Sequence, residues 1–333
     1  EGQVVATSGW EFLLPSHRRL RWSMLGEKNV GIHQFGVRTD LVGTEQVGHQ
    51  EPLYDSEGII VGSDSRAKAM MRLIPGGMAS WLMNVDPRSA SWKGTASVTA
   101  YTRAPSNYEL GANGIHHGTF RFEKGNAELK SEKSLEARFQ AGSAVSSADW
   151  GWRVQAFSAL HRDFIALGPS ATFAPISHAG QVYTFEAVNA FRTGLEISLS
   201  KTAGAWSASA DGSLLGQWDV ATGLGLPFTT PAQVTTTLGR SVHKNHQLTV
   251  SCRAIADATL TARNEAPTDG TVLWGMGWSL ARKAGTWSIN LHNASNTAWL
   301  DHTSAYRALG LVAQGRWMQF SFTTSVKQIN KNK

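Results

Sequence analysis

Residues 134–142 read SLEARFQAG, and residues 150–160 read WGWRVQAFSAL. In the first stretch the apolar side chains fall at odd positions, and in the second most of them fall at even positions. A period of two gives a β-strand one apolar face and one polar face. The two stretches therefore predict two amphipathic strands joined by a short polar connection.

The same alternation recurs along the whole chain. The other segments that show it are 31–42, 92–102, 181–189, 193–201, 206–214, 234–240, 247–254, 271–282, 287–292 and 316–324, with less regular candidates at 19–25 and 67–74. No amphipathic helix longer than two turns is evident. The count is about 14 strands, with an uncertainty of about two.

The composition agrees with an all-β protein. Glycine is abundant, with 33 residues in 333, and charged residues make up only 17%. The single Cys252 excludes an intramolecular disulfide framework and a cysteine-based metal site. The net charge of +6 suits an anionic surface such as lipopolysaccharide, or no charged partner at all. Nucleic acid is disfavoured, because no basic helix and no basic-aromatic stacking motif is present.

Short and long connections alternate between the predicted strands. The short ones are 142–149, 202–205, 241–246 and 283–285, and the long ones are 43–56, 104–133, 168–180, 216–233 and 293–315. Outer-membrane barrels have short periplasmic turns and long outer loops. No run of 18 apolar residues predicts a transmembrane helix, but a membrane strand needs only about 9–11 alternating residues. We expect an antiparallel transmembrane β-barrel in the outer membrane of a Gram-negative bacterium.

Tryptophans flank many of the strands. They are Trp150, Trp152, Trp206, Trp218, Trp274, Trp278, Trp287, Trp299 and Trp317. Tryptophan is enriched at both membrane interfaces, so an aromatic girdle is one interpretation. Core tryptophans of a soluble β-sandwich are the other interpretation.

Residues 103–134 read RAPSNYELGANGIHHGTFRFEKGNAELKSEKS. This stretch resembles a pattern of the TonB-dependent outer-membrane receptors, in which a strand ends in Arg-Ala-Pro, a loop carries Glu-Leu, and the next strand follows Gly-Asn-Pro-x-Leu-Lys-Pro-Glu-x-Ser. The matching residues are Arg103, Ala104, Pro105, Glu109, Leu110, Gly125, Asn126, Leu129, Lys130, Glu132 and Ser134. Ala127 and Ser131 stand where the family usually has proline.

Three later stretches are similar to the same family in the same order. Residues 163–169 resemble a segment leading into an outer loop, and 182–196 resemble a pair of strands that turns at Gly194. Residues 290–316 resemble the approach to the last strand. The similarity covers residues 90–324 well and the first 90 poorly, and zinc- and haem-type receptors resemble the chain most.

The resemblance implies a barrel of about 22 strands that follows a plug domain carrying the TonB-contacting segment. No stretch matches the plug, and 333 residues are too few for that many strands. The basic tail after Phe322 also departs from the family, which ends in an aromatic residue. We expect residues 1–326 to form the barrel or its C-terminal part, without a plug, and 327–333 to be disordered. Its first and last strands then pair with each other or with another polypeptide, since unpaired edges are costly in lipid.

The resemblance also suggests a metal site, since zinc receptors gather His and acidic residues above the barrel. The candidate ligands are His116, His117, His178, Glu109 and Asp163. The alternative is that the loop histidines, including His302, are simply solvated. The motif residues Arg103, Glu109, Asn126, Lys130 and Glu132 are expected to fix the start of the loop rather than to bind a ligand.

No catalytic set is evident, because neither Gly-x-Ser-x-Gly nor His-Glu-x-x-His occurs, and we do not expect an enzyme. Polar residues of the alternating strands predict a lumen lining that could set solute preference, or that only solvates the interior. They are Glu136, Arg138, Arg153, Glu196 and Asp211.

Two functions fit the pattern. The first is a receptor barrel that takes up a metal ion or metal chelate, with zinc or haem as transported ligand and no required cofactor. The second is a barrel derived from such receptors that lacks energised transport and acts as an anchor, a subunit of an envelope complex or a passive pore. Expected partners are outer-membrane lipid and lipopolysaccharide, the barrel assembly machinery, a polypeptide that completes or fills the barrel, and TonB if a plug exists outside this chain.

Overall fold

The computed structural model describes residues 17–46, 49–54, 60–67, 70–85, 92–116, 118–119, 121–143, 150–173 and 180–324. The predicted tail at 327–333 lies outside these residues. The main wall consists of β1 (His17–Val30), β2 (His33–Gln46), β5 (Met70–Val85), β6 (Trp92–Arg103), β9 (Glu132–Ser143), β10 (Trp150–Phe173), β11 (Gln181–Ala203), β12 (Trp206–Asp219), β13 (Gln233–His243), β14 (His246–Ile255), β15 (Thr271–Arg282), β16 (Gly285–His292) and β17 (Trp317–Thr323).

The remaining elements belong to the long connections. They are β3 (His49–Tyr54), β4 (Ile60–Ala67), the short helix α1 (Asn107–Gly111), β7 (Asn113–His116), β8 (Arg121–Lys124) and a 3₁₀ helix (Ala305–Leu309). None of the helices in the described ranges is long and apolar enough to cross a membrane.

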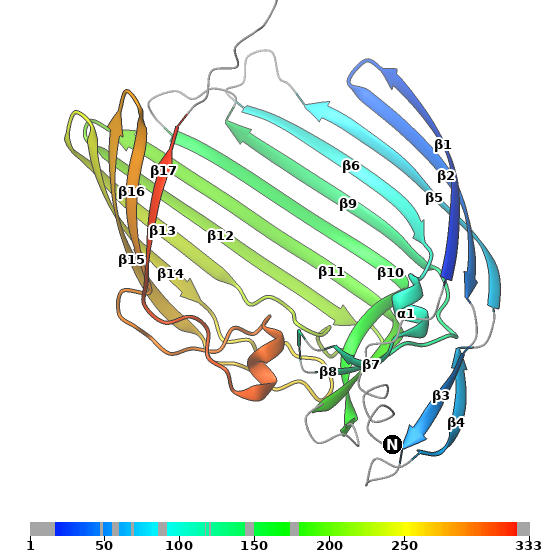
Figure 1. Cartoon of the computed structure of the whole chain (residues 1–333). Coiled ribbons are helices and arrows are strands. Elements are labelled where there is room, and N and C mark those ends of the chain that lie inside the picture. Colours follow the sequence, from blue (N-terminus) through cyan, green and yellow to red (C-terminus); the bar gives the residue numbers. More distant parts are fainter. Residues whose placement is uncertain are drawn as a thin grey trace, which may run out of the picture.

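The wall strands pair in the order in which they occur along the chain. Each neighbouring pair is antiparallel, from β1 to β17, and the sheet curves into an open wall (Figure 1). Within the described residues β1 and β17 are the two ends of this path and do not pair with each other. The antiparallel all-β fold predicted from the alternation is confirmed.

Short turns gather at one end of the wall and long connections at the other (Figure 1). Two short turns pass through Gly31 and Gly204, which adopt φ of 59° and 58°. Glycine takes this left-handed conformation at little cost, so two residues are enough to reverse the chain. The alternation of short and long connections read from the sequence is therefore present. The long connections form the loop end.

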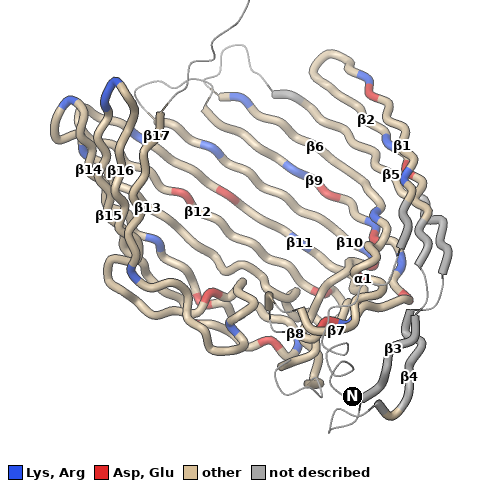
Figure 2. Tube along the Cα trace, in the orientation of Figure 1, with Lys and Arg blue, Asp and Glu red and all other residues tan. Residues whose placement is uncertain are grey.

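One face of the wall is apolar and exposed. Leu238, Val250, Met276, Leu291 and Met318 form a single row from β13 to β17, each opposite the next. Four of the five are more than 40% exposed. Burying such a row in hydrocarbon instead of water is favourable by about 25 cal/mol per Å². The exposed apolar row is thus the lipid-facing surface of a membrane barrel, and Figure 2 shows that most of the wall carries no charge.

Aromatic residues mark the turn end of this lipid face. The ring of Trp150 lies under the ammonium of Lys201, at 4.7 Å, and that of Trp206 under the guanidinium of Arg240, at 4.9 Å. Aromatic rings beside cations suit the membrane interface. Trp317 departs from the predicted girdle, because it stacks on His292, at 4.1 Å, on the opposite face.

The sequence prediction of two strands within 181–201 is wrong. β11 runs unbroken from Gln181 to Ala203. Gly194, predicted as a turn, lies in mid-strand opposite Phe157. A Cβ at Gly194 would lie 2.3 Å from the Phe157 ring, so the absence of a side chain lets the ring cover the neighbouring backbone.

The predicted outer-loop segments 168–180 and 216–233 also begin later than expected. β10 continues to Phe173 and β12 continues to Asp219. β10 and β11 therefore form a long hairpin that extends toward the loop end, and β8 pairs with β11 in parallel there. The small apolar core between this hairpin and α1 contains Leu110, Ala112, Leu129, Ile165 and Phe185.

Candidate functional site

The polar face of the wall holds all five residues predicted to line the lumen. Arg153, Ser198, Asp211, Thr235 and Arg253 form one cross-strand row over β10 to β14. The apolar row described above lies on the opposite face of the same strands. Two of the predicted residues, Arg153 and Asp211, are therefore placed on one continuous polar surface.

Glu136, Arg138 and Glu196 lie on the same polar surface, farther toward the loop end. Arg138 Nη2 is 2.9 Å from Glu136 Oε1, and its guanidinium lies over the Phe157 ring. These three residues line a hollow of about 500 Å³ together with Arg192. The hollow carries both signs of charge, and it is large enough for a small solute.

The motif at 103–134 holds the start of the long outer loop between β6 and β9. Arg103 donates to Glu109 at 2.9 Å and to Glu132 at 3.0 Å. Glu109 also accepts from the backbone N–H of Ser106, whose hydroxyl accepts from the N–H of Glu109 in return. This capping box begins α1. The geometry supports the structural role expected for Arg103, Glu109 and Glu132.

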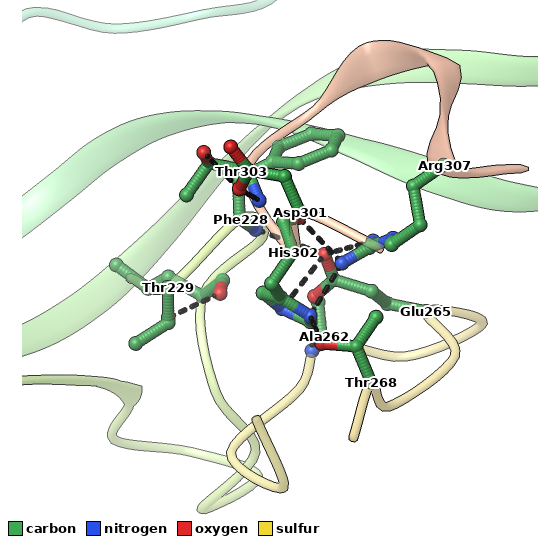
Figure 3. A network of polar contacts seen from close by, with 10 residues as sticks. Phe228, Thr229, Ala262, Glu265, Thr268, Asp301, His302, Thr303 and Arg307 are labelled. Atoms are coloured by element: carbon green, nitrogen blue, oxygen red, sulfur yellow. Dashed lines mark hydrogen bonds and ion pairs between the residues drawn. The ribbon is translucent and has the colours of Figure 1, made fainter. Parts of the chain in front are cut away.

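A second network joins three outer loops around Glu265 (Figure 3). Its carboxylate accepts hydrogen bonds from the backbone N–H groups of Phe228 and Ala262, both at 2.9 Å, and from Arg307 at 2.8 Å. The Glu265 side chain is 1% exposed. One buried acceptor therefore holds together the loops that follow β12, β14 and β16.

His302 lies inside this network and is not solvated, which corrects the sequence-based expectation. Its Nε2 is 3.6 Å from Glu265 Oε1, and its Nδ1 is 3.1 Å from the Thr268 hydroxyl (Figure 3). Burial, followed by the positive charge of Arg307, lowers the pKa of His302. This shift favours the neutral imidazole, and Arg307 is the arginine that forms the ion pair with Glu265.

Arg121 lies beside this network and forms no ion pair within the described part of the chain. Its Cζ is 4.3 Å from the ring centre of Tyr183 and 4.5 Å from that of Phe228. Its Nε is buried and has no hydrogen-bond partner. Desolvated stacking of this kind contributes about 2 kcal/mol, whereas burying an ion costs several kcal/mol. Stacking alone therefore does not offset the burial of Arg121.

Glu123 is the buried acid on the same strand. It is 3% exposed, and the Tyr108 hydroxyl donates to its carboxylate. Burial raises the pKa of Glu123 to about 7. At neutral pH the carboxyl is therefore only partly ionised and is a weak counter-charge for its neighbours.

The structure places three of the five predicted metal ligands. Glu109 is engaged by Arg103, Asp163 has its Oδ2 3.8 Å from Arg162 Nε, and His116 ends β7 with its Nδ1 3.2 Å from the Thr119 hydroxyl. His117 and His178 lie outside the described residues. Within the described ranges no three His, Cys, Asp or Glu side chains are arranged to hold a metal ion. The metal site stays a prediction.

Comparison with known proteins gives the fold. No family model and no curated protein sequence matches the chain. Among solved structures it resembles the copper transporter OprC, with a TM-score of 0.72 and 14% identity over 91% of this chain and 47% of that one. It also resembles the haemophore receptor HasR of Serratia marcescens, with a TM-score of 0.63 and 14% identity over 94% of this chain and 52% of that one.

The FrpB iron transporter of Neisseria meningitidis matches at a TM-score of 0.60, with 12% identity over 93% of this chain and 46% of that one. These are TonB-dependent outer-membrane receptors. The chain has the fold of a TonB-dependent receptor barrel. The resemblance read from residues 103–134 and the outer-membrane type of barrel are confirmed at this level. The chain spans about half the length of the receptors it matches.

Two features of the structure were not found from the sequence. The Glu265 network joins residues of three separate loops, and no local motif connects them. Arg121 carried no signal either, since its surroundings come from β11 and the loop after β12. The residues of the polar face were assigned to it from the sequence, because strand alternation places each residue on one face.

Proposed function

We propose that the chain is the barrel part of an outer-membrane receptor that takes up a metal ion or a metal chelate. The observation that carries the proposal is the polar inner surface with its charged hollow at Glu136, Arg138 and Glu196, in the fold of receptor barrels. Solved proteins of this fold include a copper transporter, an iron transporter and a haemophore receptor. All of these are transporters or receptors, and none is an enzyme.

The proposed organisation assigns residues 1–326 to the barrel and 327–333 to a tail. The apolar row from Leu238 to Met318 contacts lipid, and the outer loops face lipopolysaccharide. Strand β1 or β17 pairs with a polypeptide segment that completes the wall, and the barrel assembly machinery inserts the whole. Energised transport also requires TonB and a plug domain that TonB contacts.

A cell-based uptake assay tests this function. The gene for the full protein that contains this chain is deleted, and cellular copper, iron, zinc and haem are measured under limitation of each. We expect the deletion to lower the uptake of one of them, the intact gene to restore it, and an uncoupler of the proton-motive force to abolish it. Unchanged uptake of all four would contradict the proposal. Restored uptake that resists the uncoupler would favour the passive pore instead.

Zinc or haem is the proposed cargo, with the outer-loop site formed by His116, His117, His178, Glu109 and Asp163. Purified protein is titrated with zinc and with haem, before and after replacement of His116 and His117 by alanine. We expect the double variant to bind at least one of the two more weakly. Equal binding by the two proteins would show that these histidines are not ligands. It would not contradict the proposed uptake, which the cell assay tests separately.

A further inference from the structure

The guanidinium of Arg121 is a buried cation whose hydrogen-bonding edge is unused. Arg121 is only 8% exposed, and its Nε is buried without a hydrogen-bond partner. The rings of Tyr183 and Phe228 cover the flat face of the guanidinium. Contact with a ring face leaves the N–H groups in the guanidinium plane free to donate.

The nearby acids are committed to other partners. Glu265 accepts from Arg307 and from two backbone N–H groups. Glu123 accepts from Tyr108. Within the described residues no carboxylate forms an ion pair with Arg121. Arg121 is therefore without a direct counter-ion, and only the charge of Glu265, which already pairs with Arg307, acts on it from a distance.

A second cation increases the positive potential at this place. The Cζ of Arg307 is 5.6 Å from the ring centre of Phe228, the ring that Arg121 also covers. The Arg307 charge lowers the pKa of Arg121, after burial as the larger cause. Two guanidiniums share one ring, and a single carboxylate, Glu265, neutralises one of them.

We propose that Arg121 is the anchor of an anion-binding site at the loop end of the barrel. The ligand is a group with two anionic oxygens, a carboxylate or a phosphate, that accepts two parallel hydrogen bonds from the guanidinium edge. Arginine recognises such groups in this bidentate way. The site goes beyond the proposed uptake, because binding at Arg121 requires neither a plug nor energy.

A carboxylate or phosphate group can reach the loop end from two sources outside the cell. One is a free anion, such as the carboxylates of a chelate, and the other is a phosphate of the lipid surface around the barrel. The chemistry of recognition is the same for both. The experiment therefore offers each source separately.

The test uses the full purified protein and three variants. Arg121→Met keeps the length and apolar contact of the side chain but removes its charge and donors. Arg121→Lys keeps the charge but loses the bidentate edge. Arg263→Met is the matched control, since Arg263 is an exposed arginine of the loop after β14. Heat-modifiable gel mobility verifies that each variant has folded.

Calorimetric titration with citrate and with inorganic phosphate measures the free-anion arm. We expect Arg121→Met to weaken the binding of at least one anion by on the order of tenfold or more, Arg121→Lys to weaken it less, and Arg263→Met to leave it unchanged. The lipid arm compares vesicles of phosphatidylcholine with and without phosphatidylglycerol. Stabilisation by the anionic lipid alone that depends on Arg121 would identify the headgroup as the source.

Thermal unfolding separates an anion site from a purely structural arginine. In anion-free buffer Arg121→Met should unfold at the same temperature as the wild type or at a higher one, because it removes an unpaired buried charge. Saturating anion should raise the midpoints of the wild type and of Arg263→Met, but not that of Arg121→Met. A lower midpoint of Arg121→Met in every buffer, or binding in both arms that does not depend on Arg121, would overturn the site.

Discussion

Arg307 and Glu265 are 42 positions apart in the sequence, and their side chains form a buried ion pair at 2.8 Å. The pair joins the loop after β16 to the loop after β14. Through the N–H of Phe228 it also reaches the loop after β12. Three outer loops thus share one carboxylate, so they should open together when it is removed.

Replacement of Glu265 by alanine tests this coupling. It leaves Arg307 buried without a carboxylate partner, although Arg307 still donates to the His302 carbonyl, and it leaves two backbone N–H groups without an acceptor. Breaking a buried pair costs about 3–5 kcal/mol, and the cost falls on the loops rather than on the strands. We expect the Phe228 and Ala262 amides to exchange hydrogen at least about a hundredfold faster. Glu128→Ala is the control, because Glu128 is exposed. Unchanged exchange would show that the loops are held elsewhere.

Glu123 should make the loop end more stable in mild acid than at neutral pH. Burial raises its pKa to about 7, so the folded protein keeps the proton between pH 4.5 and 7 while the unfolded chain releases it. Stability therefore falls as pH rises through this window, by up to about 3 kcal/mol. Glu123→Gln should abolish this fall. Proteolysis rates of the outer loops at pH 5 and pH 8 measure it, with Glu128→Gln as control, and an equal fall in both variants would exclude Glu123 as the cause.

The sequence predicted the faces of the wall better than the extent of its strands. Alternation assigns Arg153 and Asp211 to one face whatever strand lies beside them, and the register confirms it. Gly194 misled the prediction because a glycine signals a turn as readily as a site covered by a cross-strand ring. Here the ring of Phe157, 37 positions earlier by the numbering, decides between the two.

The outer loops were the least predictable part, for a physical reason. The surroundings of His302 and Arg121 come from loops that are distant in sequence, and no periodicity records how loops pack. The motif at Arg103 was the exception. Its capping box is local, so the pattern of residues itself describes the contact.

The two faces of β13 should respond differently when an arginine is introduced. Leu238 is 50% exposed on the lipid face, and Thr237 is its neighbour on the polar face. Leu238→Arg should lower the free energy of unfolding in lipid by about 2–4 kcal/mol, and Thr237→Arg should change it little. Urea unfolding in vesicles of defined lipid measures both. Equal losses in the two variants would mean that the faces are assigned wrongly.

Arg103 and Arg162 both form ion pairs near the loop end, and they should differ in importance. Arg103 joins Glu109 and Glu132, and the Glu132 side chain is 4% exposed. Arg162 is 78% exposed and lies 3.8 Å from Asp163. Because Arg103 is itself 40% exposed, solvent screens part of its effect, and Arg103→Met should destabilise the loop end by about 1–3 kcal/mol.

Arg162→Met should cost at most about 0.5 kcal/mol, since exposed ion pairs contribute little. Hydrogen exchange of the Ile165 amide, which donates to Glu132, reports on the contact that Arg103 supports. We expect faster exchange in Arg103→Met and wild-type exchange in Arg162→Met. If both variants exchange as the wild type does, the apolar core around Leu110 and Leu129 is sufficient to hold the loop, and the polar motif is not required for its stability.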